Sequence, residues 1–275
     1  MLVGCDFSSS PSKRKPIVIA IGSSKQGRVH LQEIFRFDTL DAWSNWLKLP
    51  QDWIGGFDLP FGLPRELVES LQWPNNWLAC TEHFSAMPKD TIRQHFKAFC
   101  DARPVGKKFA HRKTDGPAGS SPSMKWVNPP VAFMLHAGVP RLIDAGVELP
   151  GLHTPHQEKV ASKRIALEAY PGLLARELLG NRSYKSDDKA KQTPERLIAR
   201  KQILQALETG QTRLDIRLKL THAQHDALVA DASGDTLDAV LCMVQAAWAE
   251  LQHNNDHPCY GLPMFDSIEG WIVTA

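Results

Sequence analysis

Residues 1–58 decide the fold, and they read MLVGCDFSSSPSKRKPIVIAIGSSKQGRVHLQEIFRFDTLDAWSNWLKLPQDWIGGFD. Residues 2–5, 16–21 and 29–35 form apolar or alternating runs of the kind that predict strands. The loops between them are short, which favours antiparallel neighbours and predicts a three-stranded meander. A predicted helix at 39–47 then leads to a fourth strand at 53–57, and a strand–helix–strand passage implies parallel pairing.

The rest of the chain completes a mixed sheet. Residues 163–167 predict a fifth strand, and residues 235–251 predict an apolar helix that packs on the sheet. Residues from about 65 to 160 resemble an insertion of helices and loops, and Gly, Ser, Pro and Lys at 106–128 predict a long mobile loop within it. We therefore expect one α/β domain over residues 1–275, with a mixed five-stranded sheet flanked by helices.

Composition is that of an ordinary globular protein, with 43% hydrophobic and 23% charged residues. The five cysteines have no paired spacing, which fits a reducing compartment better than a disulfide scaffold. The chain opens without an apolar leader, and no apolar run approaches the roughly 20 residues of a membrane span. We expect a cytoplasmic protein with no membrane partner.

Five acidic residues lie where the pattern predicts the end of a strand or the start of a helix. They are Asp6, Asp58, Glu168, Asp235 and Asp238. Side chains at strand ends point into the crevice where α/β sheets bind ligands, and positions i and i+3 share one face of a helix. Carboxylates that converge on one point usually hold divalent cations, because the ion offsets the repulsion between like charges. The pattern predicts a metal-dependent enzyme.

Each of these acids also has a structural interpretation. Asp6 could form an Asx turn with the serines that follow it, and Asp58 could bind backbone N–H groups in a rigid turn. Glu168 could pair with a basic residue. Asp235 could cap the last helix, with Asp238 at N3, where both charges favour the helix dipole. The apolar run after Asp238 makes the capping explanation weaker for that residue.

Basic residues flank the acidic positions along the chain. Residues 221–275 contain no Lys or Arg, whereas residues 13–28 and 103–113 are rich in both. The candidates for phosphate contact are Arg103, Lys107, Lys108, Arg112 and Lys185. Lys185 is also a candidate partner for Glu168. Basic segments around a metal site would suit a polyanion, and solvated loops are the alternative.

Several segments resemble the DUF429 family of predicted nucleases, which is assigned to the ribonuclease H-like superfamily. The segments are residues 4–8 (GCDFS), 54–64 (IGGFDLPFGLP), 168–171 (EAYP), 235–239 (DTLDA) and 269–272 (EGWI). They extend from near residue 2 to the C-terminus, and 54–64 together with 269–272 are the most specific. The resemblance implies a ribonuclease H-like fold whose first strand, fourth strand and last helix carry ligands for Mg²⁺ or Mn²⁺.

By position, the resemblance makes Asp6, Asp58 and Asp238 the catalytic residues and adds Asp235 to the metal ligands. Glu168 has no universal counterpart among the superfamily's ligands, and we carry it as an additional one. The resemblance implies hydrolysis of phosphodiester bonds in DNA or RNA by a two-metal-ion mechanism, in which the basic candidates contact phosphates.

Two other classes of protein share some of these features. A catalytically silent nucleic-acid-binding module on the same fold would keep the basic surfaces without a complete metal cluster. An actin-like ATP-dependent phosphotransferase has the same strand order, and residues 6–8 resemble its first phosphate loop. The chain lacks the later Gly-rich loops and the duplicated domain of that class, and its full set of acids favours the nuclease over the silent module.

Overall fold

The computed structural model describes residues 1–155 and 162–275. Within these residues, six strands form one mixed sheet in the order β5-β4-β1-β2-β3-β6. The strands are β1 (Leu2–Asp6), β2 (Ile17–Lys25), β3 (Arg28–Phe37), β4 (Trp53–Asp58), β5 (Arg164–Glu168) and β6 (Arg217–Lys219). Strands β1, β2 and β3 pair antiparallel, β4 pairs parallel to β1, and β5 pairs parallel to β4.

The predicted mixed α/β sheet is therefore confirmed, but the predicted count of five strands is wrong. Strand β6 lies at one edge and pairs parallel to β3. It has three residues, of which only Leu218 is buried. Such a short segment carries too little alternation to identify a strand from sequence.

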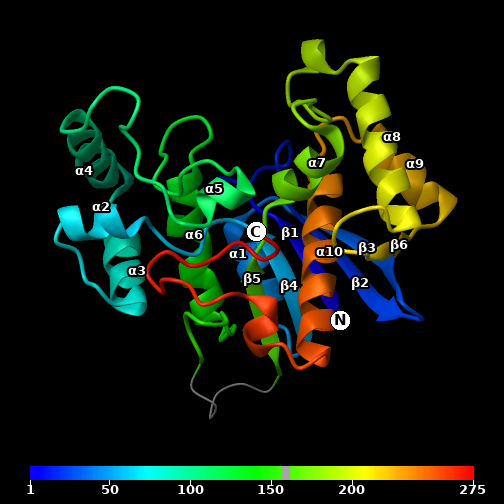
Figure 1. The fold of residues 1–275 in the computed structure, drawn as a ribbon, viewed down its shortest axis with the longest axis horizontal. Helices are drawn as coiled ribbons and strands as arrows, with labels where there is room; N and C mark the ends of the chain where they lie inside the picture. The colour runs from blue at the N-terminus through cyan, green and yellow to red at the C-terminus, as the bar shows by residue number, and fades with distance from the viewer. Residues whose placement is uncertain (156–161) are drawn as a thin grey trace.

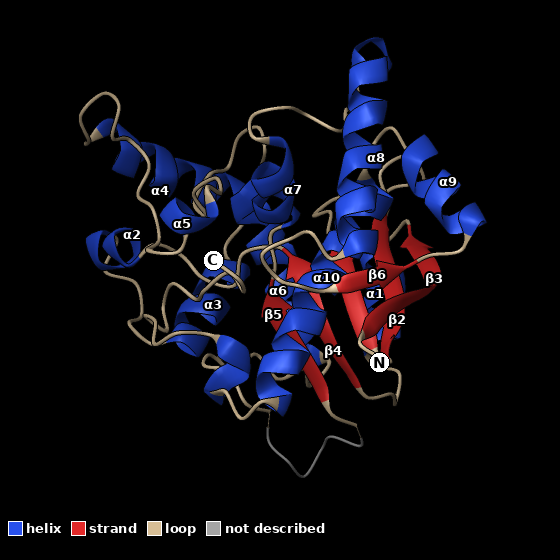
Figure 2. Cartoon of the chain, turned by 45° about the vertical axis from the view of Figure 1, so that its right-hand side comes forward, coloured by secondary structure: helices blue, strands red, loops and turns tan. Residues whose placement is uncertain are grey.

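Helices cover both faces of the sheet (Figures 1 and 2). One face packs against α1 (Leu40–Leu47) and α6 (Val131–Asp144), and the other packs against α7 (Pro171–Leu179), α8 (Pro194–Thr209), α9 (His222–Ala230) and α10 (Asp235–Asn254). The remaining helical elements are α2 (Arg65–Ser70), α3 (Trp77–Ala86), α4 (Lys89–Asp101), α5 (Asp115–Ala118), η2 (Lys189–Lys191) and η3 (Pro258–Gly261). No helix in the described ranges is long and apolar enough to cross a membrane.

The segment predicted as an insertion, about residues 65–160, holds α2 through α6 between β4 and β5. Residues 156–161 lie outside the described part of the chain, and the organisation as one domain with an insertion stays a prediction. The loop at 106–128 was expected to be mobile, yet Ala110 and Met124 are buried in the core that covers the α1 and α6 face. This loop is therefore packed against the rest of the protein.

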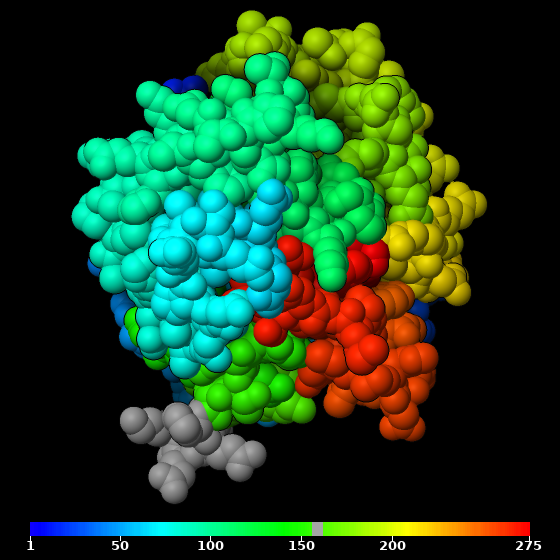
Figure 3. All heavy atoms as spheres, turned by 60° about the vertical axis from the view of Figure 1, so that its left-hand side comes forward, coloured from blue at the N-terminus to red at the C-terminus, as the bar shows by residue number. Residues whose placement is uncertain are grey.

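The C-terminal segment lies between the insertion and α10, as Figure 3 shows in red, between cyan and orange. Glu269 accepts hydrogen bonds from the backbone N–H groups of Arg65, at 3.1 Å, and Lys113, at 2.8 Å. A Cβ atom at Gly62 would lie 2.4 Å from the Glu269 carbonyl oxygen. The two segments that carry the most specific part of the family resemblance are thus in direct contact.

Helix α10 lies unusually close to β1 and β4. A Cβ atom at Gly4 would lie 1.9 Å from the Ala239 carbonyl oxygen, and one at Gly56 would lie 2.4 Å from the Cys242 carbonyl oxygen. Gly4 and Gly56 are register partners in the parallel pair. The helix therefore rests on two adjacent glycines, where any side chain would prevent its approach.

This seating decides where the acidic residues at the strand ends point. Side chains two positions apart on a strand share one face, so Asp6 lies on the face of Gly4 and Asp58 lies on the face of Gly56. Asp6 and Asp58 are themselves register partners. Both carboxylates therefore emerge beside the first turn of α10.

Gly4→Ala should lower the free energy of unfolding by about 3 kcal/mol or more, because α10 must move off the sheet to admit the methyl group. Chemical denaturation followed by circular dichroism measures the change. Gly116→Ala is the matched control, because a Cβ at that position would have no atom within 4 Å among the described residues, apart from its chain neighbours and the backbone of its own helix. We expect it to change stability by less than about 0.5 kcal/mol. Equal stabilities for the two variants would contradict the direct seating of α10.

Candidate metal centre

Three of the predicted acids meet at one point. Asp6, Asp58 and Asp238 each offer a carboxylate oxygen, and these oxygens all lie within 4.8 Å of one another. The first two end β1 and β4, and the third lies in the first turn of α10. Asp238 is fully buried, whereas Asp6 and Asp58 keep an exposed edge.

The carboxylates of Asp6 and Asp58 are uncompensated. Across the described residues, no hydrogen bond reaches either side chain. Other acids near the sheet are well supplied with donors: Glu168 accepts from the Phe61 N–H at 2.9 Å, and Asp231 accepts from the Thr236 N–H at 3.0 Å. The structure therefore gives Asp6 no Asx turn and Asp58 no backbone N–H partner.

Crowding and burial raise the pKa values of this group. Burial raises the pKa of Asp58 to about 7, the charge of Asp238 adds to the shift, and the Lys185 ammonium opposes it. Burial, followed by the charge of Asp238, raises the pKa of Asp6 well above its usual range. Because like charges are held together in a partly dry site, a divalent cation would be strongly favoured there.

Asp238 has two partners on the segment before α8. The Tyr184 hydroxyl donates to its Oδ1 atom, and the Lys185 ammonium donates to its Oδ2 atom. The predicted pairing of Lys185 with Glu168 is therefore wrong. Tyr184 is not among the residues predicted from the sequence, because a buried tyrosine resembles any other core residue. The one feature of the sequence that points to it is its position beside Lys185.

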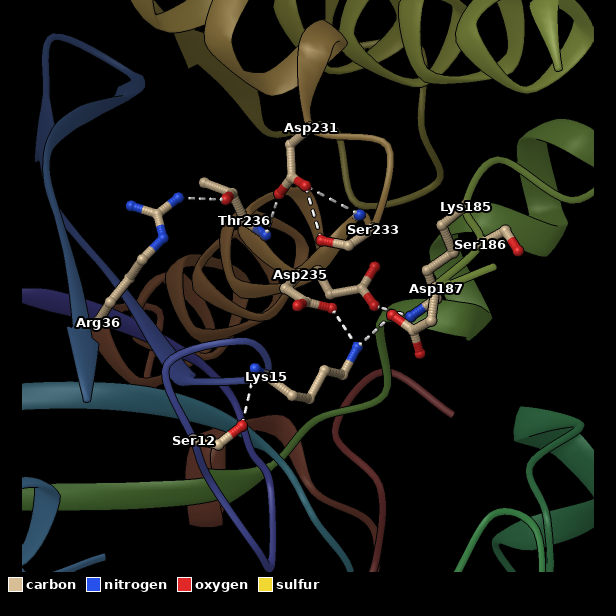
Figure 4. A network of polar contacts seen from close by, with 12 residues as sticks. Ser12, Lys15, Arg36, Lys185, Ser186, Asp187, Asp231, Ser233, Asp235 and Thr236 are labelled. Carbon is tan, nitrogen blue, oxygen red and sulfur yellow. Dashed lines mark hydrogen bonds and ion pairs between the residues drawn. The ribbon is translucent and has the colours of Figure 1, made fainter. Parts of the chain in front are cut away.

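Asp235 faces a different cation (Figure 4). The Lys15 ammonium donates to Asp235 at 2.6 Å and to Asp187 at 2.9 Å. The group of oxygens within 4.8 Å of one another does not include Asp235. Asp235 thus lies beside the three-carboxylate centre, and its predicted role as a metal ligand is replaced by an ion pair.

The predicted capping role of Asp235 is also wrong. The N-cap of α10 is Gly234, so Asp235 is the first helical residue. The carboxylate of Asp231 accepts hydrogen bonds from the N–H of Thr236 and from the hydroxyl of Ser233, at 2.7 Å (Figure 4). Asp231 therefore satisfies the start of the helix from outside it.

Glu168 points to the opposite face of the sheet. Its register partner is Phe57, which packs on the face covered by α1 and α6. The Arg112 guanidinium donates to both carboxylate oxygens of Glu168, at 2.6 and 2.8 Å. Glu168 therefore lies on the other face of the sheet from the candidate metal centre, and it forms a bidentate ion pair where a metal-ligand role was predicted.

Arg112 is not available to a phosphate, so its predicted role is wrong. The side chain is buried, with 3% of its surface exposed. Besides Glu168, its guanidinium binds Asp115 at 3.0 Å and the Glu269 carbonyl oxygen at 3.0 Å. Arg112 therefore holds the loop at 106–128, strand β5 and the C-terminal segment together.

The other basic residues predicted in this loop lie away from the carboxylates. Arg103 is paired with Glu66, and its guanidinium lies over the Phe99 ring at 4.8 Å. Lys107 and Lys108 are exposed. Figures 1 and 2 both place this segment beside α4, away from the first turn of α10. These residues do not line the candidate metal centre.

Comparisons with models of protein families, with curated proteins and with solved structures found no match in any of the three. The interpretation of the centre therefore rests on its own donor set. Carboxylate oxygens are the ligands that Mg²⁺ and Mn²⁺ prefer, and Asp6, Asp58 and Asp238 fit such an ion.

Asp58→Asn should stabilise the chelated protein at about pH 8 by roughly 1–2 kcal/mol, because it removes one charge from the crowded group. The pKa of Asp58 is raised in the folded state, to about 7. Its contribution to stability is therefore present at low pH and is lost as the pH rises through about 7. At about pH 5 the folded carboxyl holds its proton but the unfolded one has mostly lost it, so the stabilisation should be smaller there than at pH 8, and it should disappear below about pH 4.

Thermal unfolding in EDTA and in Mg²⁺ measures both effects. The wild type should gain stability from Mg²⁺ at the higher pH, and Asp58→Asn should lose that gain. Asp101→Asn removes a charge from an exposed site on α4 and serves as the control, with a change below about 0.5 kcal/mol. The account fails if Asp58→Asn destabilises the chelated protein at both pH values, or if Mg²⁺ stabilises it as much as the wild type.

Proposed function

We propose that the chain is a metal-dependent nuclease of the ribonuclease H-like, DUF429 type, which hydrolyses phosphodiester bonds. The observation that carries this proposal is the uncompensated pair Asp6 and Asp58, which faces the buried Asp238. Acids with a structural role in this chain receive hydrogen bonds or ion pairs. A cation is the simplest partner for carboxylates that the protein brings together and leaves without donors.

Asp6 and Asp58 would be shared ligands for Mg²⁺ or Mn²⁺, and Asp238 would complete the coordination of one ion. Bound there, such a pair would supply activation of a water molecule for in-line attack and stabilisation of the departing oxygen of the phosphodiester. The fold positions the three ligands. The parallel register of β1 and β4 places the carboxylates of Asp6 and Asp58 side by side, and α10 carries Asp238. Tyr184 orients Asp238 through its hydroxyl group.

The order of elements supports the same class of protein. An antiparallel meander is followed by a helix and by two parallel strands, and the last long helix lies across β1 and β4. This is the arrangement that the family resemblance implies for a ribonuclease H-like nuclease, with ligands on the first strand, the fourth strand and the last helix.

Basic turns on two sides of the centre favour a polyanionic substrate, DNA or RNA. Reciprocal backbone hydrogen bonds of 3.0 and 3.1 Å between Ser12 and Lys15 close one tight turn. Lys13 and Arg14 are exposed at its tip, while Lys15 reaches Asp235 at the start of α10. Cations at such a tip can bind a phosphate backbone without reading its sequence.

The second basic turn lies between α7 and α8. Lys185 contacts Asp238, and Lys189 and Lys191 are exposed a few residues further along. The two turns are joined, because Lys15 also binds Asp187. We therefore assign the phosphate contacts to these turns in place of the segment at 103–113.

The wild type should cleave at least one member of a panel of labelled single-stranded, duplex, hybrid and branched nucleic acids in Mg²⁺ or Mn²⁺. Asp6→Asn and Asp238→Asn should each lower the rate by about a thousandfold or more, because each removes a ligand of the ions that drive the reaction. Circular dichroism checks that the variants fold, and Asp101→Asn should cleave at the wild-type rate. Full activity in the two Asn variants, or a wild type that cleaves nothing, would disprove the mechanism. A wild type that also binds neither ion would favour the silent binding module.

A further inference from the structure

We propose that Lys185 competes with the metal ion for Asp238, and that metal binding releases its ammonium group to hold a phosphate of the substrate. The proposal rests on the proposed function, because it concerns the same centre. It adds a coupling between the two ligands: the cation and the phosphate each make binding of the other more favourable.

Both oxygens of Asp238 already accept a hydrogen bond. Oδ1 accepts from the Tyr184 hydroxyl, and Oδ2 accepts from the Lys185 ammonium. An ion bound by Asp238 together with Asp6 and Asp58 would therefore lie close to at least one of these donors. The hydroxyl is neutral, whereas the ammonium repels a divalent cation over a short distance in a poorly solvated site. Lys185 is the donor that has to leave.

The surroundings of Lys185 allow its head to move while its backbone stays in place. Its carbonyl oxygen accepts hydrogen bonds from Arg196 at 2.8 Å and from the Ser183 hydroxyl at 3.0 Å. The stem packs against Gly234, where a Cβ would lie 2.7 Å from the Lys185 Cβ. The side chain is 39% exposed, whereas Tyr184 is only 7% exposed. A flexible four-carbon stem can carry the ammonium toward solvent.

The released ammonium would stand at the rim of the centre, where a phosphate bound to the ion would also lie. The ammonium would exchange its ion pair with Asp238 for one with the phosphate. Metal binding would thus make the Lys185 ammonium available to the substrate. Coupling of this kind is reciprocal: if the metal raises affinity for phosphate, phosphate raises affinity for the metal by the same factor.

Lys15 provides a matched comparison on the same helix. Its side chain is 41% exposed, and it binds Asp235, another buried carboxylate in the first turn of α10. Asp235 is not one of the three converging carboxylates. Removing Lys15 therefore removes the same charge from nearby without emptying an oxygen of the centre.

Calorimetric titration of the full chain with Mg²⁺ and with Mn²⁺ tests the competition. Lys185→Met should bind either ion about tenfold more tightly than the wild type, or better, because the competing cation is gone. Lys15→Met should differ from the wild type by less than about threefold, since only a screened charge is lost. Lys185→Gln keeps a neutral donor for Asp238 and should also bind either ion more tightly than the wild type. This variant replaces Lys185→Met in the test if Lys185→Met does not fold.

The outcomes separate the two proposals. If the wild type binds neither ion, the proposed function fails. If the wild type binds metal and Lys185→Met and Lys185→Gln bind it equally or more weakly, only the competition is overturned. A purely structural Lys185 would change stability and leave metal affinity unchanged.

The release to phosphate has its own readout. Fluorescence anisotropy of a labelled single-stranded DNA is measured in EDTA and in Ca²⁺, an oxygen-preferring ion of the same charge. Ca²⁺ should raise the affinity of the wild type, and it should raise that of Lys185→Met by a factor at least about threefold smaller. An equal gain in both proteins would overturn this part of the proposal.

Discussion

Helix α10 can lie against the sheet only because Gly4 and Gly56 leave room beneath it, and the candidate centre depends on that contact. The two glycines are register partners, so they form one gap across β1 and β4. Asp6 lies two residues after Gly4 and Asp58 two residues after Gly56, so both carboxylates lie on the same face as the glycines. A helix held further from the sheet would carry Asp238 away from them. Close packing and convergence of the carboxylates are thus two results of one arrangement.

That arrangement brings acids together at a cost in stability. Elsewhere in the described part of the chain, buried carboxylates have hydrogen-bond or ion-pair partners, as in the pairing of Glu168 with Arg112. At the centre, Lys185 and Tyr184 donate to Asp238, whereas no donor among residues 1–155 and 162–275 reaches the other two carboxylates. Sites that bind a cation are expected to be unstable without it, because the ion is the missing partner. The absence of a donor marks Asp6 and Asp58 as candidate ligands, and Asp238 joins them because its carboxylate lies within 4.8 Å of theirs.

Much of this could be predicted from sequence, because strands and strand ends have local patterns. The meander and a parallel strand at 53–57 follow from apolar runs and loop lengths, and the resemblance implied that Asp6 and Asp58 meet. The prediction for Glu168 was wrong because it used only the position of the residue at the end of a strand. Side chains alternate along a strand, so Glu168 shares a face with Ala166 and lies opposite Leu167. Arg112 leaves no such clue, since its partners Glu168 and Glu269 lie 56 and 157 residues away. Long-range ion pairs and a three-residue edge strand have no local signature.

The most direct test is a crystal structure of the protein grown with Mn²⁺, with diffraction data collected at the manganese absorption edge. The account predicts an anomalous peak between Asp6, Asp58 and Asp238, with the Lys185 ammonium displaced from Asp238. A peak at any other place in the chain, or no peak at saturating Mn²⁺, would contradict the claim that α10 and the paired strands build a metal centre.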